Sequence, residues 1–313
     1  MTDKLKLFCG NSNPMLGKEI CHNLGVEMGK VHIQKYANEN IEVQIQENVR
    51  GADVFVLQTA SPPVNEGIME LLIMIDAIRH ASAARITAVL PYYPYARSDK
   101  KDKPRISIAA RLMADLLEAA GTDRVLAMNL HSPQTQGFFR MPADQLDASP
   151  ILCDYFRKKN LKNFTVLAVD AGRAKWAANY AKRLKLPLAI LDKRRRSDHE
   201  SAIVENIIGD VKGHHVAIFD DEILTAGSIM AAVDTLRKFG AGDVYTACVH
   251  PVLEGPAMER IRASSIKELV ITNTLPLPPS KQDPRIRILS VAGLFAEAIK
   301  RIHKGESVSE IFA

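Results

Sequence analysis

The sequence predicts an α/β fold with two domains, each a mainly parallel sheet flanked by helices. Apolar runs of strand length alternate with helical patterns along nearly the whole chain of 313 residues. Apolar strands that alternate with helices indicate parallel sheets covered on both faces. The length is sufficient for two hydrophobic cores of ordinary size. The short polar segment Asp144–Pro150 offers a boundary, which gives domains 1–147 and 148–313, with the C-terminal helix able to pack back on the first.

Each element of the first half is predicted from its own pattern. Strands are expected at Leu5–Cys9, Asp53–Gln58, Ile86–Leu90 and Arg124–Met128. The first helix has Pro14 in its first turn and Gly25 after its end. A second helix, from about Glu66 to His80, follows a Ser-Pro-Pro turn. The third is expected to be capped by Ser107 and closed by Gly121.

The second half repeats this plan. Strands are expected at Thr165–Val169, Leu188–Leu191, Val216–Phe219, Val244–Val249, Glu268–Ile271 and Ile286–Leu289. A helix that follows the third of these is expected to be capped by Ser228 and stopped by Gly240. We therefore expect the residues that carry function to follow the apolar runs, because ligands of such sheets bind at the carboxyl ends of the strands.

Composition narrows the classes of function. The net charge of +5 suits anionic small molecules, and 6% aromatic residues give no indication of nucleic acid binding. The four cysteines are scattered without a CxxC pair, which argues against zinc and for a reducing compartment. An apolar signal region and a membrane-spanning stretch are both missing from the sequence. We therefore expect a cytoplasmic protein with neither a membrane nor a nucleic acid as partner.

Two carboxylates and a glycine-containing turn follow the run Val216–Phe219. Asp220 and Asp221 come first, and Thr225–Ser228 then lead into a helix. A turn of this kind directs backbone N–H groups and a helix N-terminus at an anion. Carboxylates beside it suit a ligand that carries hydroxyls or brings a divalent metal, such as a phosphorylated sugar with magnesium. The alternative is an ordinary loop whose acids cap a helix.

Cations and a histidine follow other predicted strands. The segment Arg97–Arg105 holds five cations and two carboxylates, which is typical of a mobile loop that closes over phosphates or of a solvated linker. Lys193–Arg196 follow another strand and indicate either phosphate binding or a basic surface patch. His131 and Asp170 also follow strands, although a lone histidine is often structural. Together these segments predict a large phosphorylated ligand set, such as ATP and a sugar phosphate with magnesium.

Longer motifs resemble one enzyme family nearly end to end. They are Leu7–Pro14, Glu47–Gly51, Met69–Leu72, Tyr95–Arg97, Gln136–Phe139, Asp192–Arg195, Asn206–Val211 and Ser307–Phe312. The chain resembles the phosphate-dependent class I ribose-phosphate pyrophosphokinases, or PRPP synthetases, as a divergent subgroup. The resemblance implies two similar phosphoribosyltransferase-type domains. It also implies transfer of the β,γ-diphosphoryl group of ATP to the C1 hydroxyl of ribose 5-phosphate, which yields PRPP and AMP.

The resemblance also implies the roles of individual residues. Ribose 5-phosphate would contact Asp220, Asp221, Thr225, Ala226, Gly227 and Ser228, and ATP would contact Tyr36, Asn38, Arg97, Ser98 and His131. The catalytic cations would be Lys193, Arg195, Lys100 and Lys101, and magnesium would contact His131 and Asp170. Inorganic phosphate is expected as an activator through Arg50, Ser132 and the tail Ser307–Phe312. A homo-oligomer, a dimer-based hexamer, is expected as the assembly.

Six positions depart from the family pattern, and two of them are Ala226 for a glycine of the sugar loop and Asn40 for a glutamate near the adenine contacts. Leu224 replaces the third acid of the sugar loop, and Asn129 and Arg140 replace acids elsewhere. Arg173 replaces a glycine in the segment after Asp170. These departures support a second hypothesis, a catalytically impaired nucleotide-binding homologue that regulates or assembles with an active PRPP synthetase.

Overall fold

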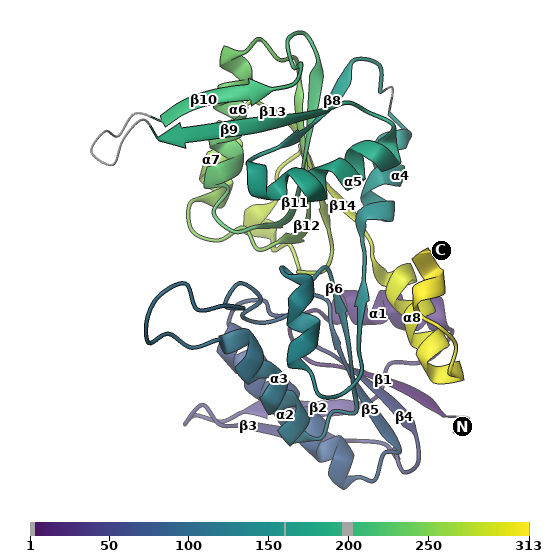
Figure 1. The fold of residues 1–313 in the computed structure, drawn as a ribbon. Helices are drawn as coiled ribbons and strands as arrows, with labels where there is room; N and C mark the ends of the chain where they lie inside the picture. Colours follow the sequence, from purple (N-terminus) through teal and green to yellow (C-terminus); the bar gives the residue numbers. More distant parts are fainter. Residues whose placement is uncertain (1–3, 160, 196–202, 313) are drawn as a thin grey trace. The chain divides into compact units, whose positions relative to one another are not determined.

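The computed structural model describes residues 4–159, 161–195 and 203–312 (Figure 1). For residues 193–195 and 203–205 it describes the backbone alone. The chain divides into two compact units. Unit 1 contains the chain up to Asp147, then Thr274–Pro276, and then the chain from Ser290 on, whereas unit 2 contains Ala148–Asn273 and Leu277–Leu289.

Unit 1 is built on a five-stranded parallel sheet. The strand order is β1-β4-β5-β6-β7, with β1 (Leu5–Cys9), β4 (Asp53–Leu57), β5 (Arg85–Leu90), β6 (Arg124–Met128) and β7 (Ala143–Leu146). A separate antiparallel hairpin is formed by β2 (Val31–Lys35) and β3 (Ile41–Ile45). Neither this hairpin nor β7 was predicted from the sequence.

The helices of unit 1 complete its core. They are α1 (Pro14–Leu24), α2 (Val64–His80), α3 (Ala109–Ala120) and α8 (Ala292–Lys304), and short 3-10 helices cover Pro133–Phe138 and Ser309–Phe312. Val54 and Val56 of β4 share one buried cluster with Ile75 of α2 and Met113 of α3. Helices α1 and α8 pack side by side in Figure 1.

The ends of two of these helices test the predicted caps. Helix α1 begins as predicted, because Asn13 Oδ1 accepts a hydrogen bond of 3.2 Å from the N–H of Leu16, and it ends at the left-handed Gly25. Helix α3 also ends at a left-handed glycine, Gly121. Its N-cap, however, is Ile108, so the predicted cap at Ser107 is wrong by one residue.

A charged cluster attaches helix α8 to the sheet of unit 1. The Arg85 guanidinium donates to both carboxylate oxygens of Asp53, at 2.8 and 2.6 Å, and to the carbonyl oxygen of Ile302 at 2.9 Å. His303 Nδ1 lies 2.8 Å from Asp53 Oδ2. The Asp53 side chain is buried, so strand β4 and the last turn of α8 share one buried carboxylate.

Unit 2 is built on a seven-stranded sheet that is parallel except at one edge. Its order is β10-β9-β8-β11-β12-β13-β14, and only the β10–β9 pair is antiparallel within the described residues. The strands are β8 (Phe164–Ala168), β9 (Leu188–Arg195), β10 (Ile203–Ile208), β11 (His215–Ile223), β12 (Val244–Pro251), β13 (Ile266–Thr272) and β14 (Ile286–Leu289). The predicted fold class is therefore confirmed.

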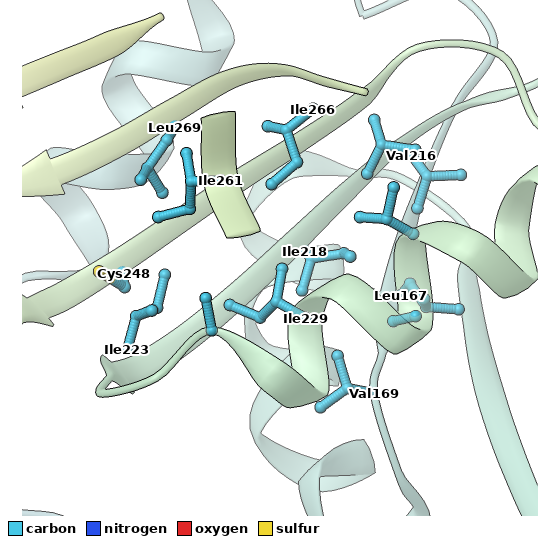
Figure 2. Close-up of a cluster of buried hydrophobic side chains, with 14 of the residues drawn as sticks. Leu167, Val169, Val216, Ile218, Ile223, Ile229, Cys248, Ile261, Ile266 and Leu269 are labelled. Carbon is cyan, nitrogen blue, oxygen red and sulfur yellow. The ribbon is translucent and has the colours of Figure 1, made fainter. Parts of the chain in front are cut away.

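Helices cover both faces of this sheet. They are α4 (Ser149–Arg157), α5 (Ala174–Leu184), α6 (Gly227–Lys238) and α7 (Ala257–Ala263), with 3-10 turns at Ala171–Arg173 and Pro279–Lys281. Figure 2 shows Val216 and Ile218 of β11 packed with Ile229 of α6 and Ile261 of α7. On the other face, the ring of Phe219 stacks on Tyr180 of α5 at 4.2 Å between centroids.

Two predicted strands end four residues too early. Strand β11 continues through the acids to Ile223, and strand β9 continues through the cations to Arg195. In both cases the backbone pairing outlasts the apolar run, with β12 beside β11 and β10 beside β9. Across the described residues, no helix combines the length and the apolar character needed to cross a membrane.

Candidate active site

The acid pair lies at the carboxyl edge of the sheet in unit 2. Strand β11 pairs with β8 as far as Ile218 and with β12 as far as Ile223, so its last residues continue beyond their contact with β8. Asp220 and Asp221 occupy this extension, where the turn that follows β8 also emerges. The backbone N–H of Asp221 donates to Asp220 Oδ1 at 2.9 Å, which fixes the first carboxylate against the strand.

Arg173, from the turn after β8, contacts both acids. Its Nη2 lies 2.7 Å from Asp221 Oδ1 and 3.7 Å from Asp220 Oδ1. Only 6% of the Asp221 side chain and 13% of the Asp220 side chain is exposed, against 29% for Arg173. The guanidinium therefore lies between a buried pair of carboxylates and the solvent. Arg173 is one of the departures named above, and its contact with the acids was not predicted from the sequence.

Burial and charge set the protonation of this cluster. Burial raises the pKa of Asp220 well above its usual range, and its hydrogen bond with Asp221 and the charge of Asp221 add to the rise, which Arg173 opposes. Burial lowers the pKa of Arg173, but the charges of Asp221 and Asp220 more than compensate and leave it raised. The acid pair thus favours holding a proton while the guanidinium stays charged.

The turn between β11 and α6 has the features of an anion site. Ala226 is the N-cap of α6 and has a left-handed backbone with φ of 58°. The helix begins at Gly227, so Ser228 lies within its first turn and the predicted cap at Ser228 is wrong. The first N–H groups of a helix have no partner inside the helix. Arg260 Nη1 donates to the carbonyl oxygen of Thr225 at 2.9 Å, which brings a cation next to this turn.

Two neighbours of the acid pair bear on metal binding. Leu224, at the position where the resemblance implies a third acid, is exposed and contributes no charge to the loop. Asp170 caps the turn Ala171–Arg173, since its Oδ1 accepts a hydrogen bond of 2.9 Å from the N–H of Arg173. Among the described residues, no group of three or more histidine, cysteine, aspartate or glutamate side chains is placed to hold a metal ion.

The predicted catalytic cations of unit 2 lie in the β9–β10 hairpin. The backbones of Lys193 and Arg195 are part of β9, opposite Glu205 and Ile203 of β10. The prediction that these residues follow the end of a strand is therefore wrong. Their side chains, and the whole of Arg196, lie outside the described residues.

The predicted ATP contacts lie on irregular segments of unit 1. Arg97 and Ser98 lie within the segment between β5 and α3, and the N–H of Ser98 donates to the carbonyl oxygen of Tyr95 at 2.8 Å. Lys100 and Lys101, further along this segment, are exposed. Tyr36 and Asn38 form the turn of the β2–β3 hairpin, where Asn38 Oδ1 accepts a hydrogen bond from the N–H of Asn40.

Two polar residues follow strand β6. His131 is partly exposed two residues beyond the left-handed Asn129, which has φ of 39°. The Asn129 side chain donates from Nδ2 to Asp147 Oδ1 at 3.2 Å. The amide at position 129 thus has a carboxylate as its neighbour.

The C-terminal tail lines a cavity of about 480 Å³ in unit 1. Arg85, Arg124 and Asp144 contribute from the sheet, and Ser307 and Ser309 contribute from the tail. Arg124 forms an ion pair with Asp144. Neither Arg50 nor Ser132, the other residues predicted to bind the activating phosphate, is part of this lining.

A parallel sheet with an acid pair and an anion-binding turn at its carboxyl edge is typical of an α/β protein that binds a phosphorylated, hydroxyl-bearing ligand. Comparison with known families identifies which family of this class the chain belongs to. Residues 5–121 match the N-terminal domain of ribose phosphate pyrophosphokinase, and residues 203–313 match the phosphoribosyl synthetase-associated domain. The chain belongs to the ribose-phosphate pyrophosphokinase family.

Full-length relatives agree with this assignment. The ribose-phosphate pyrophosphokinase of Bacillus caldolyticus is 49% identical over 99% of this chain and 98% of its own length. The enzyme of that name from Deinococcus radiodurans is 51% identical over 98% of both chains. The crystal structure of phosphoribosylpyrophosphate synthetase from Mycobacterium smegmatis superposes with a TM-score of 0.90 at 40% identity, and covers 97% of this chain and all of that one. The resemblance read from the motifs is confirmed.

Proposed function

We infer that the chain is a ribose-phosphate diphosphokinase, which transfers the β,γ-diphosphoryl group of ATP to the C1 hydroxyl of ribose 5-phosphate and releases PRPP and AMP. The observation that carries this inference is the identity of about half of all residues to ribose-phosphate pyrophosphokinases over nearly the full length. No comparison favours the impaired homologue. The enzyme is a transferase of nucleotide biosynthesis.

The acid pair and the turn after β11 are proposed to bind ribose 5-phosphate. Asp220 and Asp221 would accept hydrogen bonds from the ribose hydroxyls, because carboxylate oxygens are strong acceptors. The N–H groups at the start of α6, with Thr225 and Ser228, would bind the 5-phosphate. This proposal is supported by the position of both groups on the same strand-turn-helix segment of unit 2.

The remaining predicted residues are proposed to act on ATP. Tyr36, Asn38, Arg97, Ser98 and His131 would hold the nucleotide. Lys193, Arg195, Lys100 and Lys101 would stabilise negative charge on the diphosphoryl group as it moves. Transfer of this kind depends mainly on positioning and on electrostatic stabilisation, which explains why the proposed catalytic groups are cations.

Magnesium is proposed to enter as the complex with ATP, with His131 and Asp170 as its predicted protein contacts. The acid pair does not fit a divalent cation in this structure, because Arg173 already contacts both of its carboxylates. Asp170 also uses one oxygen to cap its own turn. No step is therefore assigned to a metal held by Asp220 and Asp221.

Three further properties stay predictions. Inorganic phosphate is proposed as an activator, and the cavity beside Ser307 and Ser309 supports a role for the tail in binding it. A dimer-based hexamer and a cytoplasmic location are proposed from the resemblance and from the scattered cysteines.

A direct assay tests the proposed reaction. ATP, ribose 5-phosphate, magnesium and phosphate are incubated with the protein, and AMP and PRPP are quantified. We expect equal amounts of both products. Lys193→Ala should lower kcat by roughly 10²- to 10³-fold, because it removes a charge proposed to act on the transferring group.

Lys182→Ala, at an exposed lysine on α5, is the matched control and should keep the parent rate. Background AMP in the parent, unchanged in Lys193→Ala, would contradict the proposed function and favour the regulatory homologue.

A further inference from the structure

The charge around the acid pair is balanced by the protein itself. Two neighbouring carboxylates that are both buried and both fully charged carry a large cost in free energy. Burial raises the pKa of Asp220, which lowers the negative charge that the pair carries. Arg173 supplies one positive charge at 2.7 Å from Asp221. A divalent cation that approached this cluster would meet a site where the Arg173 charge already offsets the acids.

Arg173 is held in this position by its own turn. Its backbone N–H donates to Asp170 Oδ1 at 2.9 Å, and it is the residue directly before helix α5. The side chain therefore starts from a fixed backbone at the sheet edge where the acids emerge. A guanidinium also carries five N–H donors, more than two carboxylate contacts require, so it can still donate to a ligand oxygen.

Two positions near the acid pair make its surroundings more positive than in the pattern that the resemblance implies. The resemblance gives a glycine at 173 and an acid at 224, whereas this chain has a cation and an exposed leucine. Relative to that pattern the turn after β8 has gained one positive charge and the turn after β11 has lost one negative charge. Both changes reduce the attraction of the cluster for a metal ion.

We propose that Arg173 is the resident counter-cation of the Asp220–Asp221 pair and takes the place of a divalent metal ion there, so that ribose 5-phosphate binds these acids without metal. Arg173 is then a positioning residue that holds both carboxylates ready for the sugar hydroxyls. The identity of the sugar phosphate rests on the proposed function, but the counter-cation role does not.

Binding of Mn²⁺ alone tests the counter-cation role without turnover. Free Mn²⁺ is followed by its electron paramagnetic resonance signal in a titration with the apoprotein, without nucleotide or sugar. We expect Arg173→Gly to bind one more Mn²⁺ per chain than the parent, about tenfold or more tighter than any parent binding at this position. Arg173→Gly/Asp221→Asn should lose the gained ion, and Arg173→Lys should behave as the parent.

Arg173→Gln guards against a folding failure, because it keeps most of the side chain and removes only the charge. Fluorescence of Trp176, the single tryptophan, reports whether unit 2 is folded in each variant. Folded variants that gain no Mn²⁺ would overturn the inference. A parent that loses a Mn²⁺ ion on Asp221→Asn would also overturn it, since the pair would then already hold metal.

Calorimetry with ribose 5-phosphate separates this inference from the proposed function. With EDTA present, the parent should bind the sugar phosphate, and Arg173→Gly should need Mg²⁺ to bind it at comparable affinity. A parent that binds only with Mg²⁺ would overturn the inference and leave the function intact. A parent that binds under neither condition would contradict the function, while the Mn²⁺ titration would still decide the role of Arg173.

Discussion

At the scale of single residues, Asn129 shows how a departure from the family pattern is accommodated. It lies directly after β6 with φ of 39°, a backbone conformation that asparagine and aspartate tolerate better than most residues. Its amide donates to Asp147 at 3.2 Å. The aspartate expected from the resemblance would put a second carboxylate beside Asp147, so the amide removes a repulsion.

Asn129→Asp should therefore destabilise unit 1. Two carboxylates at this distance disfavour the charged form of each, and we expect a loss of about 1–2 kcal/mol in unfolding free energy at pH 7. The loss should shrink near pH 4, where one carboxyl group accepts a proton. Urea unfolding followed by circular dichroism measures both values.

The double variant Asn129→Asp/Asp147→Asn serves as the control and should recover most of the loss. A single variant as stable as the parent at pH 7 would show that the two side chains do not interact.

The acid pair shows what single residues allowed us to predict. Asp220, Asp221 and the turn Thr225–Ser228 were found because acids and a glycine directly follow an apolar run. Their contact with Arg173 could not be predicted, since it joins turns after two different strands. Such a contact depends on which strands are neighbours, and the spacing of residues along the chain does not contain that information.

At the scale of elements, the apolar runs predicted where the strands lie more accurately than they predicted where the strands end. Strand β6 has the predicted bounds, whereas β9 and β11 each continue for four residues of charged or mixed sequence. Hydrogen bonds to a neighbouring strand do not require apolar side chains, so the ladder can outlast the core. The hairpin of β2 and β3 contains no continuous apolar run and was therefore missed, although the period-two alternation in Val31–Lys35 and Ile41–Ile45 was an available signal.

Helix α8 gives a prediction at this scale. Asp53→Asn should loosen its last turn, because the amide removes the charge that pairs with Arg85 and faces His303. Breaking a buried ion pair by removing one partner is costly, and we expect about 2 kcal/mol or more. Amide hydrogen exchange in α8 should become roughly tenfold faster or more, as measured by mass spectrometry.

Asp144→Asn is the matched control. It breaks the Arg124–Asp144 pair on neighbouring strands of the same sheet, where both side chains are about one quarter exposed. Exchange in α8 should stay at the parent rate. Equal acceleration in both variants would mean that the Asp53 cluster has no special part in attaching the helix.

At the scale of the whole molecule, stability should depend on pH through Asp220. Its raised pKa means that the folded state keeps a proton which the unfolded state releases near pH 4. Stability therefore falls as pH rises from that value towards the folded pKa. Asparagine at this position has no proton to release. The unfolding free energy of Asp220→Asn should therefore rise relative to that of the parent as pH rises.

Urea unfolding followed by Trp176 fluorescence, which reports unit 2, measures this difference at pH 4, 6 and 8. The two proteins should be closest at pH 4. A constant difference across this range would show that the folded state does not retain the proton.

The fold class could be predicted from the sequence because it depends on a pattern that is repeated through both units. Alternation of apolar strands and helices predicts parallel sheets wherever it occurs, and both sheets follow it. The unit to which a single segment belongs could not be predicted in this way. Thr274–Pro276 and the chain from Ser290 on belong to unit 1, although β14 immediately before Ser290 belongs to unit 2.

This interleaving of the two units affects the order in which they are completed during synthesis. A ribosome releases the chain from its N-terminus, and compact units generally fold as they emerge. Unit 2 is complete once Leu289 is available, but unit 1 still lacks α8, which packs on α1. Unit 1 contains the first strand to be synthesised but is the last unit to be completed. Until almost the entire chain has been made, the side of α1 that packs on α8 stays uncovered. A nascent chain stopped before Ser290 should therefore be more open to chaperones and proteases in its first half than in its second.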